Sequence, residues 1–173
     1  MIAHRYVASL CMAALASSLA AAPLAGQGTD PAMNAATRAA IDNLRTENAW
    51  TVDQQVSICE IPAPPFKEAV RGAEMKRRFE TLGLRNVRID SIGNVVAERP
   101  GTGGGPVVIF SAHLDTVFPE GTEVRVKRQG TLLSGPGIGD DCRGLAVILS
   151  VARAMRTAGV QTAGTIYFVA NVG

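Results

Sequence analysis

The sequence lacks a charge excess of either sign. Its 173 residues carry 17 Lys and Arg side chains against 15 Asp and Glu side chains, a formal net charge of +2. One of the basic residues, Arg5, lies in a segment that we expect to be removed, which brings the balance still closer to neutral. Proteins that bind nucleic acid through its phosphates need a strongly basic surface. We therefore expect no nucleic-acid partner.

Cysteine is also scarce, with three residues in the chain: Cys11, Cys59 and Cys142. Small exported proteins without a sufficient core depend on several disulfides. A chain of 173 residues that is 47% hydrophobic can form a core of its own, so a disulfide-rich framework is excluded. We expect Cys59 and Cys142 to be free or half-buried thiols, and a single disulfide between them is the alternative.

The first 25 residues are predicted to be a signal peptide. His4 and Arg5 form a short basic start, an apolar stretch follows over residues 6–19, and the small residues AAAPLA offer a cleavage site after Ala25. A membrane anchor is the alternative, but the stretch is short and rich in alanine and serine, whereas a spanning helix needs about 20 strongly apolar residues. We expect an exported protein, periplasmic or secreted, with no membrane attachment after cleavage.

A linker over residues 26–34 and one α/β domain from residue 35 onward are predicted to follow. The runs PVVIFSA (106–112) and TIYFVANV (165–172) are continuous and rich in β-branched residues, which is typical of strands buried on both faces. The first strand is followed by a loop with a hairpin, then by a helix and then by the second strand. This order indicates a right-handed crossover and a largely parallel sheet. The other expected elements are helices over 35–45, 52–59, 68–82 and 142–159, short strands at 87–89 and 94–98, and a hairpin turning at Gln129-Gly130.

Histidine is rarer still: apart from His4, His113 is the only one. It comes at the end of the strand predicted for residues 107–112, and Asp115 follows two positions later. Sites in α/β sheets form beyond the carboxyl ends of strands, and positions two apart in an extended segment project to the same side. A carboxylate beside a histidine can accept one ring N–H and leave the other nitrogen free for a metal. Taken alone, the pair could equally be a structural contact.

A second polar group occurs in SGPGIGDDCRG (134–144), where Asp140 and Asp141 stand in a glycine-rich loop before the long predicted helix. One aspartate would suit the helix N-cap, but capping does not explain two in succession. A phosphate-binding loop is excluded because no lysine follows and paired carboxylates repel phosphate. One imidazole and one carboxylate from neighbouring loops are half of a ligand set for zinc, cobalt or manganese, and a carboxylate can bridge two such ions.

The motifs SAHLDTVFPEGT and GPGIGDDCRGLAVIL, in this order and at this spacing, resemble those of a metal-dependent exopeptidase and deacylase family. The family includes carboxypeptidase G, peptidase T, acetylornithine deacetylase and succinyl-diaminopimelate desuccinylase. EIPAPPF before the motifs and FVANVG after them fit the same pattern. The resemblance implies a three-layer α/β domain of zinc-exopeptidase type with a largely parallel central sheet. It also implies hydrolysis of peptide or amide bonds in small peptides or N-acyl amino acids.

Residue by residue, the resemblance implies that His113 is a metal ligand and that Asp115 orients it. Asp140 resembles the aspartate that bridges two zinc ions, with Co²⁺ or Mn²⁺ as alternatives to Zn²⁺. Asp141 is assigned to the loop and the helix start, and Cys142 is close enough to be an alternative thiolate ligand. A homodimer is expected only for a full-length form.

In this family a glutamate general base and a second acidic ligand follow the strand that here ends FVANVG, where the sequence stops at Gly173. We therefore expect residues 35–173 to be the N-terminal portion of a catalytic domain, incomplete at its C-terminus, without the lid or dimerisation domain and inactive alone. The strand at 165–172 would then be an exposed edge. The alternatives are a member of the related zinc aminopeptidase family and a non-catalytic half-domain that binds a metal or a partner.

Overall fold

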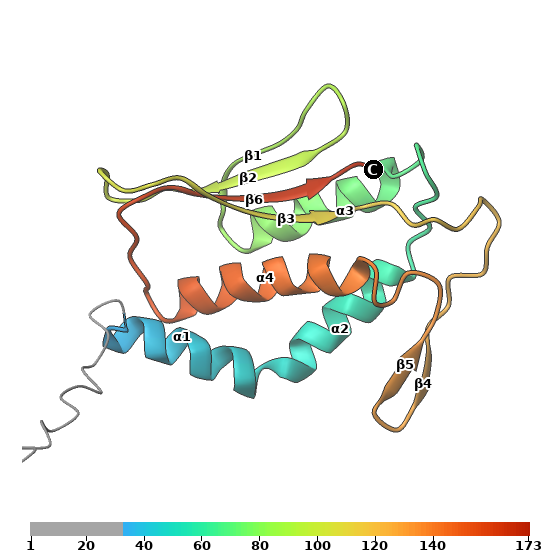
Figure 1. Cartoon of the computed structure of the whole chain (residues 1–173), viewed down its shortest axis with the longest axis horizontal. Helices are drawn as coiled ribbons and strands as arrows, with labels where there is room; N and C mark the ends of the chain where they lie inside the picture. The colour runs from blue at the N-terminus through green and yellow to red at the C-terminus, as the bar shows by residue number, and fades with distance from the viewer. Residues whose placement is uncertain (1–32) are drawn as a thin grey trace, which may run out of the picture. The chain divides into compact units, whose positions relative to one another are not determined.

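The computed structural model describes residues 33–173, so the predicted signal peptide and most of the predicted linker lie outside the described residues. No helix in this part of the chain has both the length and the apolar character that crossing a membrane requires. Figure 1 shows the elements, which are α1 (Ala35–Thr46), α2 (Asn48–Cys59), α3 (Ala69–Thr81), β1 (Arg85–Ile89), β2 (Val95–Arg99), β3 (Val108–His113), β4 (Lys127–Gln129), β5 (Leu132–Ser134), α4 (Cys142–Thr157) and β6 (Ile166–Asn171).

Four strands form the main sheet, in the order β1-β2-β6-β3. The predicted crossover is present: β3 leads through the β4–β5 hairpin and α4 to β6, and β3 pairs with β6 in parallel. The other two pairs, β1 with β2 and β2 with β6, are antiparallel. The α/β class is therefore confirmed, and in the described residues the sheet is mixed, because a tight turn after β1 returns the chain antiparallel. The Asp90 carboxylate stabilises that turn by accepting the amide N–H groups of Ile92, Gly93 and Asn94.

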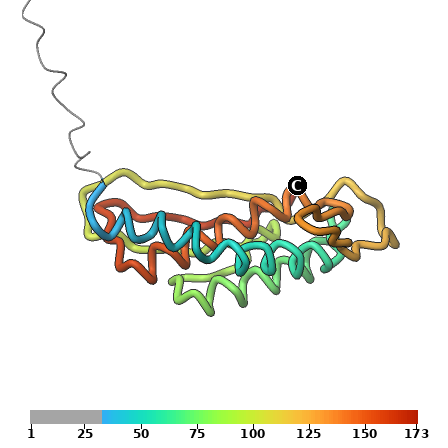
Figure 2. The backbone as a smooth tube through the Cα atoms, turned by 90° about the horizontal axis from the view of Figure 1, so that it is seen from below, coloured from blue at the N-terminus to red at the C-terminus, as the bar shows by residue number. Residues whose placement is uncertain are grey.

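The hydrophobic core lies on one face of the sheet. Alternate residues of the strands, such as Ala97 and Phe168, point to this face and pack against side chains of α2, α3 and α4. Figures 1 and 2 show the helices on this side of the sheet, with α1 and α2 against α4. The layers of the described part are thus the sheet, then α3 and α4, then α1 and α2. No described helix covers the opposite face, where Ile109, Tyr167 and Val169 lie.

The positions of the two long strands differ from the prediction. The strand at 106–112 was expected to be buried on both faces, and the strand at 165–172 was expected to be the exposed edge. In the structure β6 lies between β2 and β3, and every second residue of it is buried. The strand at the edge is β3, where Val108 is 42% exposed and Ile109 is 62% exposed. Hydrophobic composition alone could not distinguish the two, since position in a sheet depends on pairing with distant strands.

Helix α3 begins one residue later than predicted and ends one earlier, and Gly83 follows it with a φ of +73°, a left-handed conformation that glycine readily adopts at the end of a helix. Its buried residues are Arg71, Gly72, Met75 and Phe79, at helical spacing. Ala69 and Ala73 are exposed on the other side of the helix. The buried face of α3 therefore includes an arginine.

On the outer side of α3, Glu74 accepts hydrogen bonds from Arg77 and Arg78, which hold its pKa down at about 2. A carboxyl group with a lowered folded-state pKa stabilises the fold above its unfolded pKa of about 4.3, and this contribution disappears as the pH falls toward 2. Glu74→Gln is therefore expected to lower the free energy of unfolding by about 2 kcal/mol at pH 7, and by much less near pH 2.5.

Urea unfolding followed by circular dichroism at both pH values measures this difference. Glu80→Gln is the matched control, because Glu80 pairs only with Lys76 at an exposed site on the same helix. Its effect should stay within about 0.5 kcal/mol at either pH. A loss in Glu74→Gln that is equally large at pH 7 and pH 2.5 would contradict the electrostatic explanation.

Candidate metal site

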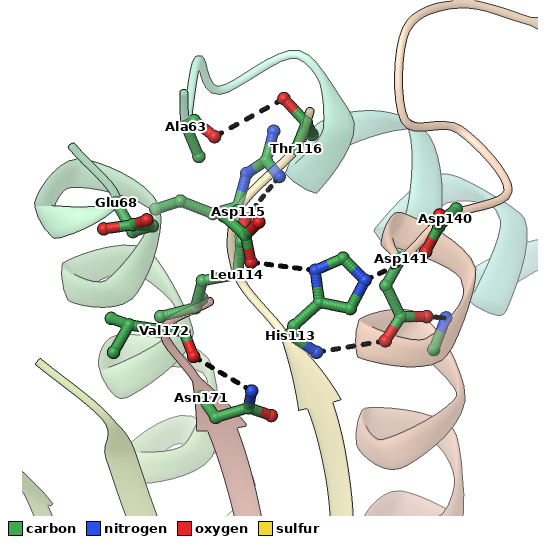
Figure 3. A network of polar contacts seen from close by, with 12 residues as sticks. Ala63, Glu68, His113, Leu114, Asp115, Thr116, Asp140, Asp141, Asn171 and Val172 are labelled. Atoms are coloured by element: carbon green, nitrogen blue, oxygen red, sulfur yellow. Dashed lines mark hydrogen bonds and ion pairs between the residues drawn. The ribbon is translucent and has the colours of Figure 1, made fainter. Parts of the chain in front are cut away.

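His113 is the last residue of β3, and the chain remains extended after it. Asp115 therefore projects to the same side, and its Oδ1 lies 2.9 Å from His113 Nδ1 (Figure 3). The imidazole is about one-third exposed, whereas the Asp115 side chain is mostly buried. The contact between His113 and Asp115 that their two-residue spacing predicted is therefore present.

Asp140 approaches the other side of the same ring. Its Oδ1 lies 2.9 Å from His113 Nε2, and its side chain is 85% exposed at the start of α4. Partial burial by itself would lower the pKa of His113, but the hydrogen bonds with Asp140 and Asp115 outweigh it, so the pKa is raised above its ordinary value. The structure therefore brings together the three residues that the resemblance selected.

Asp141 joins the two segments of the site. It is the N-cap of α4, where its Oδ1 accepts the amide N–H of Gly144 at 2.9 Å, and its Oδ2 accepts the amide N–H of His113 at 3.0 Å (Figure 3). A Cβ at position 144 would overlap the Asp141 carboxylate, so glycine is required there. The peptide bond between Asp140 and Asp141 is cis. One aspartate thus caps the helix as predicted and also binds the end of β3, which the sequence did not indicate.

The glycine-rich loop contacts the segment after Asp115 directly. Gly137 has a φ of +74°, and a Cβ added there would lie 2.6 Å from Cγ2 of Thr116. Gly135 and Gly139 do not have the left-handed conformation that glycine permits. From α2, Gln55 donates to the Ile138 carbonyl oxygen at 2.7 Å, two residues before Asp140. The position of Asp140 therefore depends on α2 as well as on α4.

Arg71 is a residue of this region that the sequence analysis missed. It is completely buried, and its guanidinium donates to the carbonyl oxygens of Leu114 at 2.7 Å, Ile61 at 2.5–3.0 Å and Cys59 at 3.3 Å. Leu114 stands between His113 and Asp115, so Arg71 holds the site segment from behind. Burial lowers the pKa of Arg71 from its ordinary value. The signal in the sequence was a charged residue at helical spacing from the apolar residues Met75 and Phe79.

The end of β6 also reaches the site. The Asn171 carbonyl oxygen accepts the Leu114 amide N–H at 2.7 Å, which extends the parallel pairing past His113. A Cβ added at Gly173 would lie 2.6 Å from the Asp115 Cγ atom. The backbone at Gly173 therefore lies against the Asp115 carboxylate, next to the imidazole that this carboxylate contacts.

Cys142 does not contribute to the group around His113. Its thiol is fully buried, next to the thiol of Cys59. The neighbouring thiol and burial together raise the pKa of Cys142, which disfavours the thiolate form. The alternative in which this cysteine is a thiolate ligand receives no support from the geometry.

The chemistry of the donors present suits a zinc ion, with one imidazole nitrogen and one carboxylate from neighbouring loops. Nδ1 of His113 faces Asp115, so Nε2 is the nitrogen directed toward Asp140. Residues 33–173 contain no group of three or more His, Cys, Asp and Glu side chains placed to hold a metal ion. His113 and Asp140 thus fit a metal in type and direction, and they supply two of the three or four protein ligands that a zinc site normally has.

His113 and Asp115 thus lie at the carboxyl end of β3, where α/β sheets form their ligand sites, and Asp140 reaches them from the loop before α4. In comparisons with known proteins, residues 94–173 match the model of Peptidase family M28. Carboxypeptidase G2 of Pseudomonas sp. (strain RS-16) is 33% identical over 110 residues, which are 60% of this chain and 26% of that protein. The chain therefore spans about a quarter of this relative.

Two solved structures share the fold. Aminopeptidase PepT from Bacillus cereus aligns with a TM-score of 0.62 at 24% identity, over 71% of this chain and 36% of that one. The YXEP protein of Bacillus subtilis, described as a dinuclear metal-binding peptidase from the M20 family, aligns with a TM-score of 0.53 at 18% identity, over 73% and 35% of the two chains. The predicted resemblance to the exopeptidase family that includes carboxypeptidase G is confirmed.

Proposed function

We propose that this chain is part of a metal-dependent hydrolase that cleaves peptide or amide bonds, of exopeptidase or N-acyl amino acid deacylase type. The observation that supports it is the position of His113 between Asp115 and Asp140, at the carboxyl end of β3. His113 Nε2 and the Asp140 carboxylate are the metal ligands in this proposal, and Asp115 orients the imidazole. The dinuclear metal site described for the YXEP protein, which shares the fold, is consistent with this assignment.

Each residue has a physical role in the proposed site. Asp115 accepts the Nδ1–H of His113, which fixes the tautomer whose Nε2 lone pair is free for a metal. Asp141 holds the end of β3 against the start of α4 and so fixes the separation of His113 from Asp140. A zinc ion bound there would lower the pKa of a water ligand and polarise the carbonyl of an amide substrate.

The general base is a further part of the proposal. In the family that the motifs resemble, it follows the strand corresponding to β6, and here the backbone at Gly173 lies beside Asp115. A glutamate carried after Gly173 would thus reach the site from β6. Small peptides or N-acyl amino acids are the proposed substrates, zinc is the proposed metal, and export through the N-terminal signal peptide is the proposed route.

The test is zinc binding to the 173-residue chain, measured by isothermal titration calorimetry. We expect weak binding that decreases more than about 100-fold in His113→Ala and in Asp140→Ala, because each removes one of two ligands. Glu120→Ala is the matched control, since this exposed acid forms an ion pair with Lys67 and should leave zinc binding unchanged.

Wild-type zinc affinity in His113→Ala would overturn the assignment of the metal site. In any longer form of the protein that continues past Gly173, the same two variants should lose hydrolysis of small peptides and N-acyl amino acids. Loss of zinc binding with retained hydrolysis there would overturn the proposed function but leave the metal site in place.

A further inference from the structure

Two buried cysteines meet where α2 ends and α4 begins. Cys59 is the last residue of α2, Cys142 is the first residue of α4, and both are 0% exposed. Each thiol lies close enough to the other to be the largest influence on its pKa. The two helices pack against one another, and the side-chain hydroxyls of Thr51 and Ser150 are 2.7 Å apart in their interface.

The backbone gives independent support for this proximity. The Cys59 Sγ atom donates to the Pro136 carbonyl oxygen at 3.3 Å, and the Cys142 amide N–H donates to the Gly137 carbonyl oxygen at 3.2 Å. Both cysteines are thus bonded to consecutive residues of one loop. These two bonds place the cysteines beside one another at one end of the α2–α4 interface, and proximity of the two residues is the first requirement for a disulfide.

Neither thiol has a role in the proposed metal site, which uses His113 and Asp140. A purely packing role would be met by any small apolar residue, since free buried cysteine behaves as a small hydrophobic side chain. Two such residues, brought beside one another from segments far apart in the sequence, also have a specific chemical capacity, which is the formation of a covalent bond. We propose that Cys59 and Cys142 are oxidised to a disulfide that joins the end of α2 to the start of α4.

The oxidant in this proposal is a small-molecule disulfide such as oxidised glutathione. The sulfur of one cysteine, as thiolate, attacks the small disulfide, forms a mixed disulfide and releases one small thiolate. The second cysteine then attacks the protein sulfur of the mixed disulfide and releases the other. The two protons lost by the protein thiols are taken up by the two released thiolates. The protein has lost two electrons, and the small disulfide has been reduced to two thiols.

Folding determines when this exchange can occur. Both sulfurs are inaccessible in the folded chain, so we expect the bond to form during folding, before α2 and α4 have closed over it. The bond would close a loop of roughly 80 residues, which restricts the unfolded chain and stabilises the folded one. We expect the oxidised protein to melt about 5–15 °C above the reduced protein. This inference does not depend on the proposed function, since no metal or substrate takes part.

The experiment is oxidative refolding of the full chain in a buffer of oxidised and reduced glutathione. Free thiols are then alkylated under denaturing conditions, and the protein is digested and examined by mass spectrometry. We expect a linked peptide pair containing Cys59 and Cys142, with Cys11 alkylated. The variant Cys11→Ser should keep the link, whereas Cys59→Ala and Cys142→Ala should lose it. The melting temperature should fall when dithiothreitol is added to the wild type and should not respond in Cys59→Ala.

Three outcomes would overturn the proposal. They are alkylation of both Cys59 and Cys142 after oxidative refolding, a predominant link from either residue to Cys11, and stable mixed disulfides with glutathione in place of the protein bond. The peptide map of the wild type decides between them even if the alanine variants fold poorly.

Discussion

Exchanging Arg71 for methionine is expected to lower the free energy of unfolding by about 3–5 kcal/mol, a large share of the stability of a domain of this size. Methionine nearly fills the space, but it cannot donate to the carbonyl oxygens of Cys59, Ile61 and Leu114. These three acceptors would then be buried without partners, and each unsatisfied group costs about 1–3 kcal/mol. Urea unfolding followed by circular dichroism at pH 7 measures the loss.

Two further variants make this measurement specific. Arg71→Lys keeps the positive charge but has one ammonium group in place of a planar guanidinium with several donors, so an intermediate loss is expected. Arg45→Met removes an exposed arginine from α1 and should change stability by less than about 0.5 kcal/mol. Equal stability of Arg71→Met and Arg45→Met would show that the hydrogen bonds of Arg71 contribute nothing net.

The second large effect is expected at Asp115. Asp115→Asn should weaken zinc binding about 10–100-fold, although residue 115 is not itself a proposed ligand. Asparagine has almost the same shape, but its amide can donate as well as accept, so it no longer selects the His113 tautomer with hydrogen on Nδ1. Calorimetric zinc titration gives the affinity, and the ¹⁵N chemical shifts of the His113 ring report the tautomer.

Asp53→Asn is the control, because Asp53 is an exposed acid on α2 and the exchange alters charge by the same amount. We expect it to bind zinc as the wild type does. If Asp115→Asn retained both the wild-type affinity and the wild-type ring tautomer, orientation by Asp115 would not be needed. If the His113 tautomer changed while the zinc affinity did not, Asp115 would select the tautomer without contributing to zinc binding.

The sequence allowed the site to be located because its signals are local. His113 and Asp115 are two positions apart at a strand end, and Asp140 precedes a helix with clear apolar periodicity, so topology alone brings them to one edge of the sheet. The roles of these residues as ligands and orienting group remain predictions. The bounds of α1 and α3, each within one residue, and the β4–β5 hairpin also followed from short-range patterns, whereas α2 begins four residues before its predicted start.

What the sequence did not indicate depends on distant contacts. The edge position of β3 follows from the insertion of β6 beside β2, which no composition rule specifies. The burial of Arg71 depends on three carbonyl groups from two other segments, and the bond from Asp141 to the His113 amide depends on the packing of α4 against β3. Charged residues with such partners are exceptions to the pattern of apolar cores, and their partners are visible only in three dimensions.

The place of β6 in the sheet has a consequence for how the protein folds. Strands β2 and β3 do not touch; each pairs with β6, the last of the described strands, whose partners lie roughly 60–75 positions earlier in the chain. During synthesis the ribosome releases both strands well before β6, so the backbone groups of β2 and β3 that later bond to β6 remain unpaired until then. Folding should consequently be slow, and the nascent chain should depend on a chaperone until residues 166–171 have emerged.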